Sequence, residues 1–212
     1  MIQLLLPERI TLRDGGARTN DANLHEIPPI NDPWKPLASA LLDGIIAAPM
    51  NQRPIIISVI GGSNAAQKDL DVAYEVGLEL AKRGAIVLCG GLTGVMEAAC
   101  RGAKEAGGTT IGIMPGNTAG DANQYVDIAI PTGLGYARNA IVARAGGAII
   151  AIDGAYGTLS EIGHGLGDGT PIVGLNTWQF TIDGKVDTTI DKAKSPLEAV
   201  EKALEYAKAR QD

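Results

Sequence analysis

The pattern of apolar and polar positions changes at Pro54. From this residue onward, short β-branched runs that end in glycine alternate with segments in which apolar or small residues recur every three to four positions. A short apolar run bounded by glycine is typical of a buried parallel strand, and the longer spacing is typical of one face of a helix. Their alternation predicts βαβ units.

The predicted elements follow one another closely. Strands are expected at residues 55–60, 85–89, 109–114, 125–130, 147–152 and 171–175, and helices at 69–83, 93–106, 136–145, 158–166 and from 196 onward. Residues 180–187 predict a hairpin that turns on Asp-Gly, and Ser195 is the expected N-cap of the last helix. The fold class predicted for residues 54–212 is a doubly wound, mostly parallel, Rossmann-like α/β sheet with helices on both faces.

Residues 1–53 differ from the rest of the chain. They contain six of the eleven prolines and no sustained apolar period. We expect an N-terminal arm or linker with one short helix at 36–47, packed on the body or on a neighbouring subunit.

Composition narrows the function classes. The 212 residues suit one domain, and 28 glycines with only one Phe, two Trp and five Tyr predict an aliphatic core joined by tight turns. The net charge of −6 argues against a nucleic-acid partner, and two Cys with two His argue against a metal site built from protein ligands alone. No apolar run reaches about 18 residues, so we expect no membrane span and a cytoplasmic protein.

Glycine-rich segments follow five of the predicted strands. Because the carboxyl ends of parallel strands meet at one edge of the sheet, we expect these segments to converge there. Helix N-termini attract anions, and glycine lets a phosphate approach the backbone, which predicts a phosphorylated small-molecule ligand. The expected ligand-binding residues are Gly61, Gly62, Ser63, Gly90, Gly91, Thr93, Gly94, Asn117, Gly154, Ala155, Tyr156, Gly157 and Thr158.

The common nucleotide signatures are absent from the sequence. The first predicted strand is followed by GGSNAA rather than G-x-G-x-x-G, and the second ends in Cys89-Gly90 where a dinucleotide fold places its ribose-binding acid. No G-x-x-x-x-G-K-[S/T] occurs. An ordinary NAD site and a P-loop are therefore not expected.

Two segments resemble the LOG superfamily, a Rossmann-like group formerly described as lysine decarboxylases. Residues 90–98 (GGLTGVMEA) are similar to its G-G-x-x-G-[L/V]-M segment, and residues 152–161 (IDGAYGTLSE) to its P-G-G-x-G-T-x-x-E motif. Arg138 lies fifteen residues before Asp153, in the position of the motif arginine, and we expect Arg138 and Glu161 to bind the ligand together with the thirteen residues named above. The resemblance runs from about Pro54 to Trp178.

The departures from these motifs favour one branch of the superfamily. Asp153 and Ala155 replace the Pro and the second Gly of the hydrolase motif, which favours the molybdenum-cofactor carrier proteins. This resemblance implies a carrier that holds molybdenum cofactor, or a similar phosphorylated pterin, rather than a catalyst. It also implies a homodimer or homotetramer and molybdenum enzymes as recipients. Helices rich in Ala and Gly, which bury little area per residue, favour a core extended across a subunit interface.

Two alternatives remain open at this stage. One is a nucleoside 5′-monophosphate phosphoribohydrolase with Arg138 and Glu161 as catalytic residues, and the other is a nucleotide-sensing module without turnover. Arg138 could instead form a surface salt bridge, Glu161 could cap its helix together with Thr158, and Tyr156 could be a lid over a planar ring or an ordinary loop aromatic.

Overall fold

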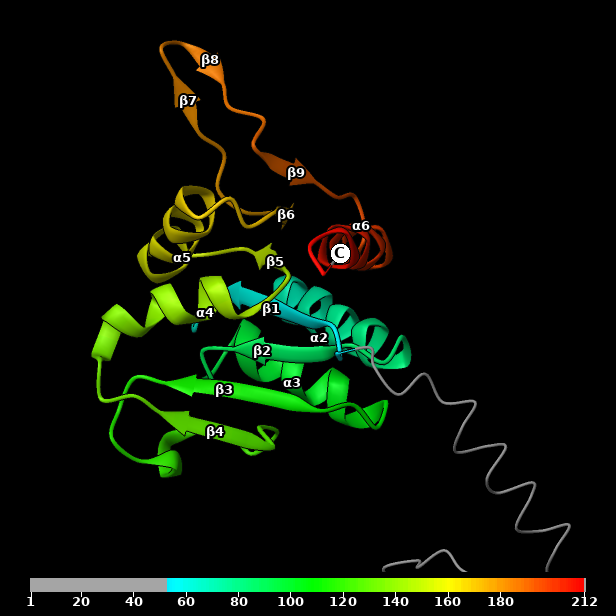
Figure 1. Ribbon diagram of the computed structural model, residues 1–212, viewed down its shortest axis with the longest axis vertical. Helices are drawn as coiled ribbons and strands as arrows, with labels where there is room; N and C mark the ends of the chain where they lie inside the picture. Colours follow the sequence, from blue (N-terminus) through cyan, green and yellow to red (C-terminus); the bar gives the residue numbers. More distant parts are fainter. Residues whose placement is uncertain (1–52, 212) are drawn as a thin grey trace, which may run out of the picture. The chain divides into compact units, whose positions relative to one another are not determined.

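The computed structural model describes residues 53–211. The arm predicted for residues 1–53, with its short helix, lies outside the described residues apart from Arg53. Seven parallel strands form one sheet (Figure 1). They are β1 (Ile56–Gly61), β2 (Ile86–Cys89), β3 (Thr110–Met114), β4 (Ile128–Pro131), β5 (Ala148–Ile152), β6 (Ile172–Leu175) and β9 (Ile190–Lys192). The order across the sheet is β4-β3-β2-β1-β5-β6-β9, which confirms the predicted doubly wound α/β fold.

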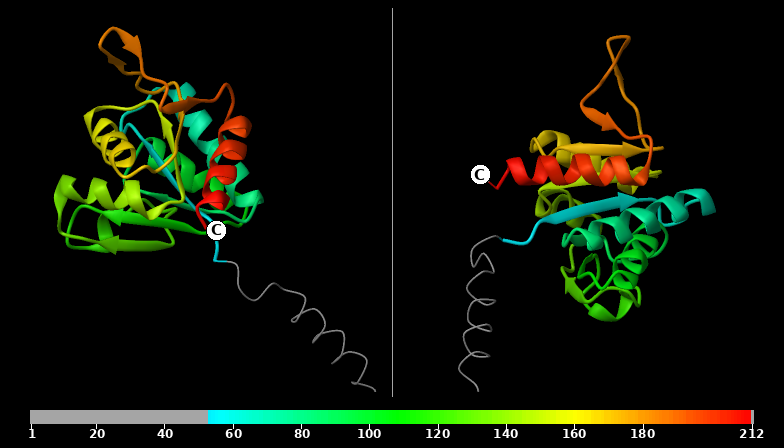
Figure 2. Two further views of the ribbon diagram at one scale, coloured as in Figure 1. Left: turned by 45° about the horizontal axis from the view of Figure 1, so that its top comes forward. Right: turned by 90° about the vertical axis from the view of Figure 1, so that its right-hand side faces the viewer.

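Helices cover both faces of this sheet (Figure 2). The helices α2 (Gln67–Lys82), α3 (Val95–Glu105) and α6 (Pro196–Ala209) pack on one face, and α4 (Asn139–Ala145) and α5 (Tyr156–Gly167) pack on the other. Two 3-10 turns, η1 (Ala119–Asp121) and η2 (Gly135–Arg138), lie in the connections on either side of β4. The buried side chains on both faces are mainly Ile, Val, Leu and Ala, as the composition predicts.

The helices α2 and α3 touch through their backbones. A Cβ atom on Gly77 would lie 1.9 Å from the Ala99 carbonyl oxygen, and one on Gly102 would lie 2.0 Å from the Tyr74 carbonyl oxygen. Only glycine fits at these two positions, because no side-chain atom can share that space. The two helices therefore form one closely packed pair beneath the first half of the sheet.

The chain changes direction between β1 and β5. It runs from β1 outward to β4 and then returns to β5, which pairs with β1 on its other side. The loops after β1 and β5 therefore lead to helices on opposite faces of the sheet. Ligands of such folds bind in the crevice that opens at this switch point.

Three local features differ from the sequence prediction or extend it. The strand expected from residue 125 begins at Ile128, because the side chains of Thr110 and Asp127 exchange hydrogen bonds with each other's backbone amides in place of ladder bonds. The helix expected from residue 136 begins with the 3-10 turn η2. The strand β9 was not predicted from the sequence.

The predicted hairpin is confirmed. Its strands β7 (Thr181–Ile182) and β8 (Lys185–Val186) are joined by Asp183 and Gly184, which have φ angles of 50° and 74°. The hairpin extends away from the seven-stranded sheet (Figure 2). Among residues 53–211, no helix is both long and apolar enough to cross a bilayer.

One part of the sheet surface carries exposed apolar side chains. The helix α4 has seven residues and packs on β1 and β2. Ile128 and Ile130 of β4, on the same face, are 48 % and 43 % exposed. Three further apolar side chains are exposed: Leu134, which precedes η2, Tyr136 of η2 and Ile141 of α4. We call these five residues the β4 face.

Candidate functional site

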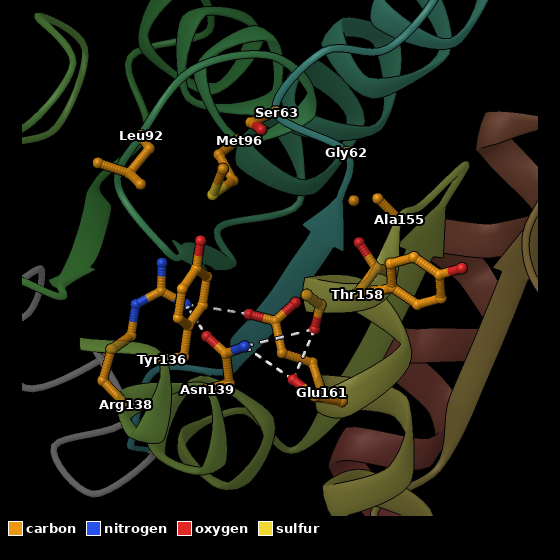
Figure 3. Close-up of a pocket in the computed structure, with 14 residues that line it drawn as sticks. Gly62, Ser63, Leu92, Met96, Tyr136, Arg138, Asn139, Ala155, Thr158 and Glu161 are labelled. Atoms are coloured by element: carbon orange, nitrogen blue, oxygen red, sulfur yellow. Dashed lines mark hydrogen bonds and ion pairs between the residues drawn. The ribbon is translucent and has the colours of Figure 1, made fainter. Parts of the chain in front are cut away.

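A pocket with a volume of about 580 Å³ opens beyond the carboxyl ends of the central strands (Figure 3). It lies at the switch point between β1 and β5. The loops after β1, β2 and β5 form its sides together with η2, the start of α4 and the first turns of α5. Its position agrees with the prediction that the glycine-rich segments converge at this edge.

Nine of the fifteen site residues predicted from the sequence line this pocket. They are Gly61, Gly62, Ser63, Arg138, Ala155, Tyr156, Gly157, Thr158 and Glu161. These residues come from three separate segments of the chain, 61–63, 138 and 155–161. A Cβ atom on Gly157 would meet no described protein atom within 4 Å, so this glycine faces open space at the start of α5.

The other six predicted residues lie outside the lining. They are Gly90, Gly91, Thr93, Gly94, Asn117 and Gly154. Several of them hold the loops together: the Thr93 hydroxyl donates to the Ser63 carbonyl at 3.2 Å, and a Cβ atom on Gly94 would lie 2.3 Å from the Gly62 carbonyl oxygen. Asn117 lies against Gly133 at the end of β3. Thr93 and Gly94 therefore pack against the loop after β1, which lines the pocket.

Five lining residues were not predicted from the sequence. They are Leu92, Met96, Tyr136, Asn139 and Ser160. Asn139 and Ser160 directly neighbour the motif residues Arg138 and Glu161, which is a signal that could have identified them. Leu92 and Met96 lie in the motif segment 90–98, which is a signal that could have identified them, whereas Tyr136 carried no pattern that distinguished it.

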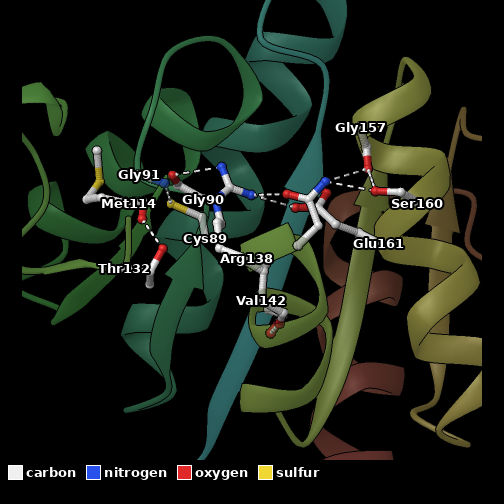
Figure 4. Close-up of polar contacts among 12 residues, drawn as sticks. Cys89, Gly90, Gly91, Met114, Thr132, Arg138, Val142, Gly157, Ser160 and Glu161 are labelled. Carbon is white, nitrogen blue, oxygen red and sulfur yellow. Dashed lines mark hydrogen bonds and ion pairs between the residues drawn. The ribbon is translucent and has the colours of Figure 1, made fainter. Parts of the chain in front are cut away.

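Arg138 and Glu161 form an ion pair in the wall of the pocket (Figure 4). Arg138 Nη1 lies 3.2 Å from Glu161 Oε1, and Arg138 Nη2 donates to the Gly90 carbonyl at 3.2 Å. Both side chains are less than a tenth exposed, so the interpretation of Arg138 as a surface salt bridge is wrong. The buried Arg138 Nε has no hydrogen-bond partner among the described residues.

The capping interpretation of Glu161 is also wrong. The helix α5 begins at Tyr156, two residues before the predicted start, with Ala155 as its N-cap. Thr158 therefore lies inside the first turn and cannot be the N-cap of a capping box. Asp153 and Gly154, with φ angles of 52° and 134°, turn the chain into the helix early. Glu161 consequently lies in the second turn, where its carboxylate reaches Arg138.

The environment of Glu161 changes its protonation. Burial raises the pKa of the Glu161 carboxyl to about 7, although the neighbouring Arg138 guanidinium lowers it. A buried carboxylate loses hydration that one cation only partly replaces. Glu161 can therefore gain or lose a proton near neutral pH, as a general acid or base must.

Asn139 connects the arginine to the first turn of α5. Its side-chain oxygen accepts a hydrogen bond from Arg138 Nη1, and its Nδ2 donates to Ser160 Oγ at 2.8 Å and to the Gly157 carbonyl at 3.4 Å. Ser160 Oγ in turn donates to the Gly157 carbonyl at 2.8 Å. This network fixes the position of Arg138 relative to the glycine-rich segment before α5 (Figure 4).

The pocket can take an anionic group but offers no cluster of metal ligands. The backbone amides at the start of α5 are a favourable place for a phosphate. Nowhere in residues 53–211 do three His, Cys, Asp or Glu side chains gather to hold a metal ion. Cys89 and Cys100, the two cysteines, are buried and free, with their sulfur atoms 3.5 Å apart.

Known proteins share the sequence features of this chain. The sequence model of the SLOG cluster4 family matches residues 54–206. An uncharacterized protein of Archaeoglobus fulgidus is 40 % identical over 119 residues. The match covers 56 % of this chain and 78 % of that protein.

Two solved structures are similar over nearly their whole length. The molybdenum cofactor binding protein of the phototrophic bacterium Rippkaea orientalis is 35 % identical, with a TM-score of 0.65, and the match covers 76 % of this chain and 100 % of that one. The molybdenum cofactor carrier protein of Chlamydomonas reinhardtii is also 35 % identical, with a TM-score of 0.65, and the match covers 73 % and 98 %.

Proposed function

Because this chain belongs to the SLOG cluster4 family, a LOG-like group with the Rossmann fold, we propose that it binds and carries molybdenum cofactor or a similar phosphorylated pterin. The observation that carries the proposal is the pocket at the switch point, in a fold shared at 35 % identity with proteins that bind or carry this cofactor. The pocket is large enough for one small ligand, since such sites commonly measure about 300–1,000 Å³.

The residues of the pocket fit such a cargo. The start of α5 presents backbone amides and the open space at Gly157 to a phosphate. The unpartnered Nε of Arg138 is a buried donor at the same pocket. A polar, hydrogen-bonding heterocycle could pair with it, since a buried donor without a partner costs free energy. When bound, the cofactor brings its own molybdenum ligands, so the protein has to recognise the organic part.

The test is anaerobic binding of the cofactor to the purified full-length chain. We expect a stoichiometric molybdenum content, fluorescence of the oxidised pterin after release, and protection of the cofactor from oxidation. Molybdenum that co-elutes without pterin would contradict the proposal, as would a chain that takes up no cofactor from a solution in which it is intact.

A second candidate function rests on the Arg138–Glu161 pair. A carboxyl with a pKa of about 7 beside a buried guanidinium can activate water or stabilise positive charge at a ribosyl carbon. This candidate is hydrolysis of nucleoside 5′-monophosphates to free base and ribose 5-phosphate. Incubation with AMP, GMP and CMP tests it: release of base that disappears in Glu161→Gln would establish this enzyme activity.

The proposal also includes the oligomeric state of the protein. The β4 face is uncovered, and residues 128–137 that supply most of it contain no charged residue. Two copies of an acidic chain repel each other except where a surface lacks charge, so a second copy fits this face better than a charged partner does. We infer a homodimer or homotetramer in the cytoplasm, with molybdenum enzymes as recipients of the cofactor.

A further inference from the structure

Two tyrosines stand at the opening of the pocket. Tyr136 of η2 and Tyr156, the first residue of α5, both line it, yet they are 87 % and 82 % exposed. No other large hydrophobic side chain in residues 53–211 is as exposed. In Figure 3 the Tyr136 side chain extends from η2 toward Met96 of α3 and Ser63 of the loop after β1. The two rings belong to different elements, so they reach the opening from separate parts of the chain.

The inner part of the pocket has the opposite character. Arg138 and Glu161 are 6 % exposed and Thr158 is 2 % exposed. The pocket therefore has a buried polar interior and an aromatic opening. A bare phosphate could use only the interior together with the start of α5. A ligand that also carries a flat ring could cover the two tyrosines, each of which can bury roughly 150–250 Å² of surface.

The Tyr156 ring lies next to a second aromatic ring, that of Trp178. Its centroid lies 6.3 Å from that of the Trp178 ring, with the two planes tilted by 37°. Trp178 packs against the aliphatic core on the α4–α5 face, and its Nε1 is buried without a partner among the described residues. The exposed Tyr156 ring therefore has the partly buried Trp178 ring as its neighbour, and Trp178 is placed to report on what binds to it.

From these observations we propose that Tyr136 and Tyr156 pack against the planar ring of the ligand and so select a phosphorylated heterocycle over a simple phosphate ester. The inference rests on the proposed function and adds the determinant of specificity. Aromatic stacking on a heterocycle discriminates by ring size and flatness, whereas the phosphate contacts are common to all phosphorylated ligands.

The experiment uses a phosphorylated pterin and glycerol 3-phosphate as probes. Trp34→Phe leaves Trp178 as the single tryptophan of the full chain, whose fluorescence then follows binding. In this background Tyr136→Ala and Tyr156→Ala are compared with Tyr136→Phe and Tyr156→Phe, which keep the ring. We expect each alanine variant to weaken pterin binding roughly tenfold and the phenylalanine variants to bind within about threefold of the parent. Glycerol 3-phosphate should bind equally to all five proteins.

The outcomes separate this inference from the function on which it rests. If the parent protein binds neither the pterin nor molybdenum cofactor, the proposed function fails and the inference fails with it. If the parent binds the pterin and the alanine variants bind it as tightly, the inference alone is wrong. The mass of each variant is measured by light scattering, because Tyr136 also belongs to the β4 face. A change in mass with Tyr136→Ala would overturn the role assigned to that residue.

Discussion

The Glu161 carboxylate lies 3.2 Å from the Arg138 guanidinium, and both groups are buried in the wall of the pocket. Removing two charges from water costs free energy that their mutual attraction does not always repay. In this pair the attraction only partly offsets the desolvation of the carboxylate, because burial raises the pKa of Glu161 to about 7. The pair is therefore arranged for a function at the pocket more than for stability.

This raised pKa predicts a pH-dependent free energy of unfolding. The unfolded chain releases the Glu161 proton near its ordinary pKa of 4.5, whereas the folded chain keeps it up to about pH 7. The stabilisation from the protonated acid is therefore complete below about pH 4.5 and is lost as the pH rises through 7. Glu161→Gln keeps a neutral side chain at every pH. Relative to the wild type, its free energy of unfolding should rise by about 2 kcal/mol between pH 5.5 and 8.

Urea unfolding at the two pH values measures this difference. Glu198→Gln is the control, because the pKa of the exposed Glu198 is lowered by the Lys194 backbone amide and Lys202, so this acid is ionised throughout the range. The control should show the same pH slope as the wild type. Parallel slopes for Glu161→Gln and the wild type would contradict the raised pKa.

Gly157, in the first turn of α5, allows a direct test of the proposed phosphate site. A Cβ atom there meets no described protein atom within 4 Å, and we expect the valine methyl groups to occupy the space where we place the phosphate. Gly157→Val should therefore abolish binding of a phosphorylated pterin while the circular dichroism and Tm stay close to those of the wild type. Gly163→Val, at an equally open position on the same helix, is the matched control and should bind normally. Retained binding in Gly157→Val would show that the phosphate lies elsewhere.

The close contact between α2 and α3 leaves no room for a side chain at Gly77. Alanine in place of an exposed helical glycine ordinarily stabilises by about 0.5–1 kcal/mol. At Gly77 the added methyl group would lie 1.9 Å from a backbone oxygen, so Gly77→Ala should destabilise the fold by roughly 1–3 kcal/mol. Chemical denaturation of Gly77→Ala beside Gly163→Ala gives the comparison, and equal stabilities would be incompatible with this packing.

Self-association is tested at the β4 face. Light scattering of the wild type should give at least twice the chain mass of 21.9 kDa. Ile130→Asp introduces a charge into the proposed interface and should shift the mass to that of one chain. Ile182→Asp alters a more exposed apolar residue on the hairpin and should leave the assembly intact. A wild-type mass near 22 kDa would refute self-association, and an assembled Ile130→Asp would place the interface elsewhere.

The strands of the central sheet could be predicted because their residues are buried on both faces. Val59, Leu88 and Ile150 lie in runs whose hydrophobic character does not depend on distant partners. The start of β4 could not be predicted, since it depends on side-chain bonds between Thr110 and Asp127, seventeen residues apart. The strand β9 could not be predicted either, because it has only three residues, two of them charged. It is recognised as a strand only by its pairing with β6.

At the pocket, the segments could be predicted but the partners of individual side chains could not. Three of the five glycine-rich strand ends contain residues that line the pocket, those after β1, β2 and β5. The sequence 158–161 fits a capping box, and only the backbone conformation of Asp153 and Gly154 shows that the helix begins earlier. Likewise, Arg138 and Glu161 are twenty-three residues apart, so their pairing depends on how α4 and α5 pack together.

The backbone contact between α2 and α3 also gives the pocket two unequal halves. The segment 90–94 leads into α3, whose backbone touches that of α2. The opposite half, formed by η2, α4 and α5, is held together by Asn139 and Ser160. The Arg138 guanidinium bridges the two halves by its bond to the Gly90 carbonyl. One side chain therefore links the glycine-rich loop after β2 to the helices on the other side of the pocket, and a ligand that breaks this bond would separate that loop from η2 and α4.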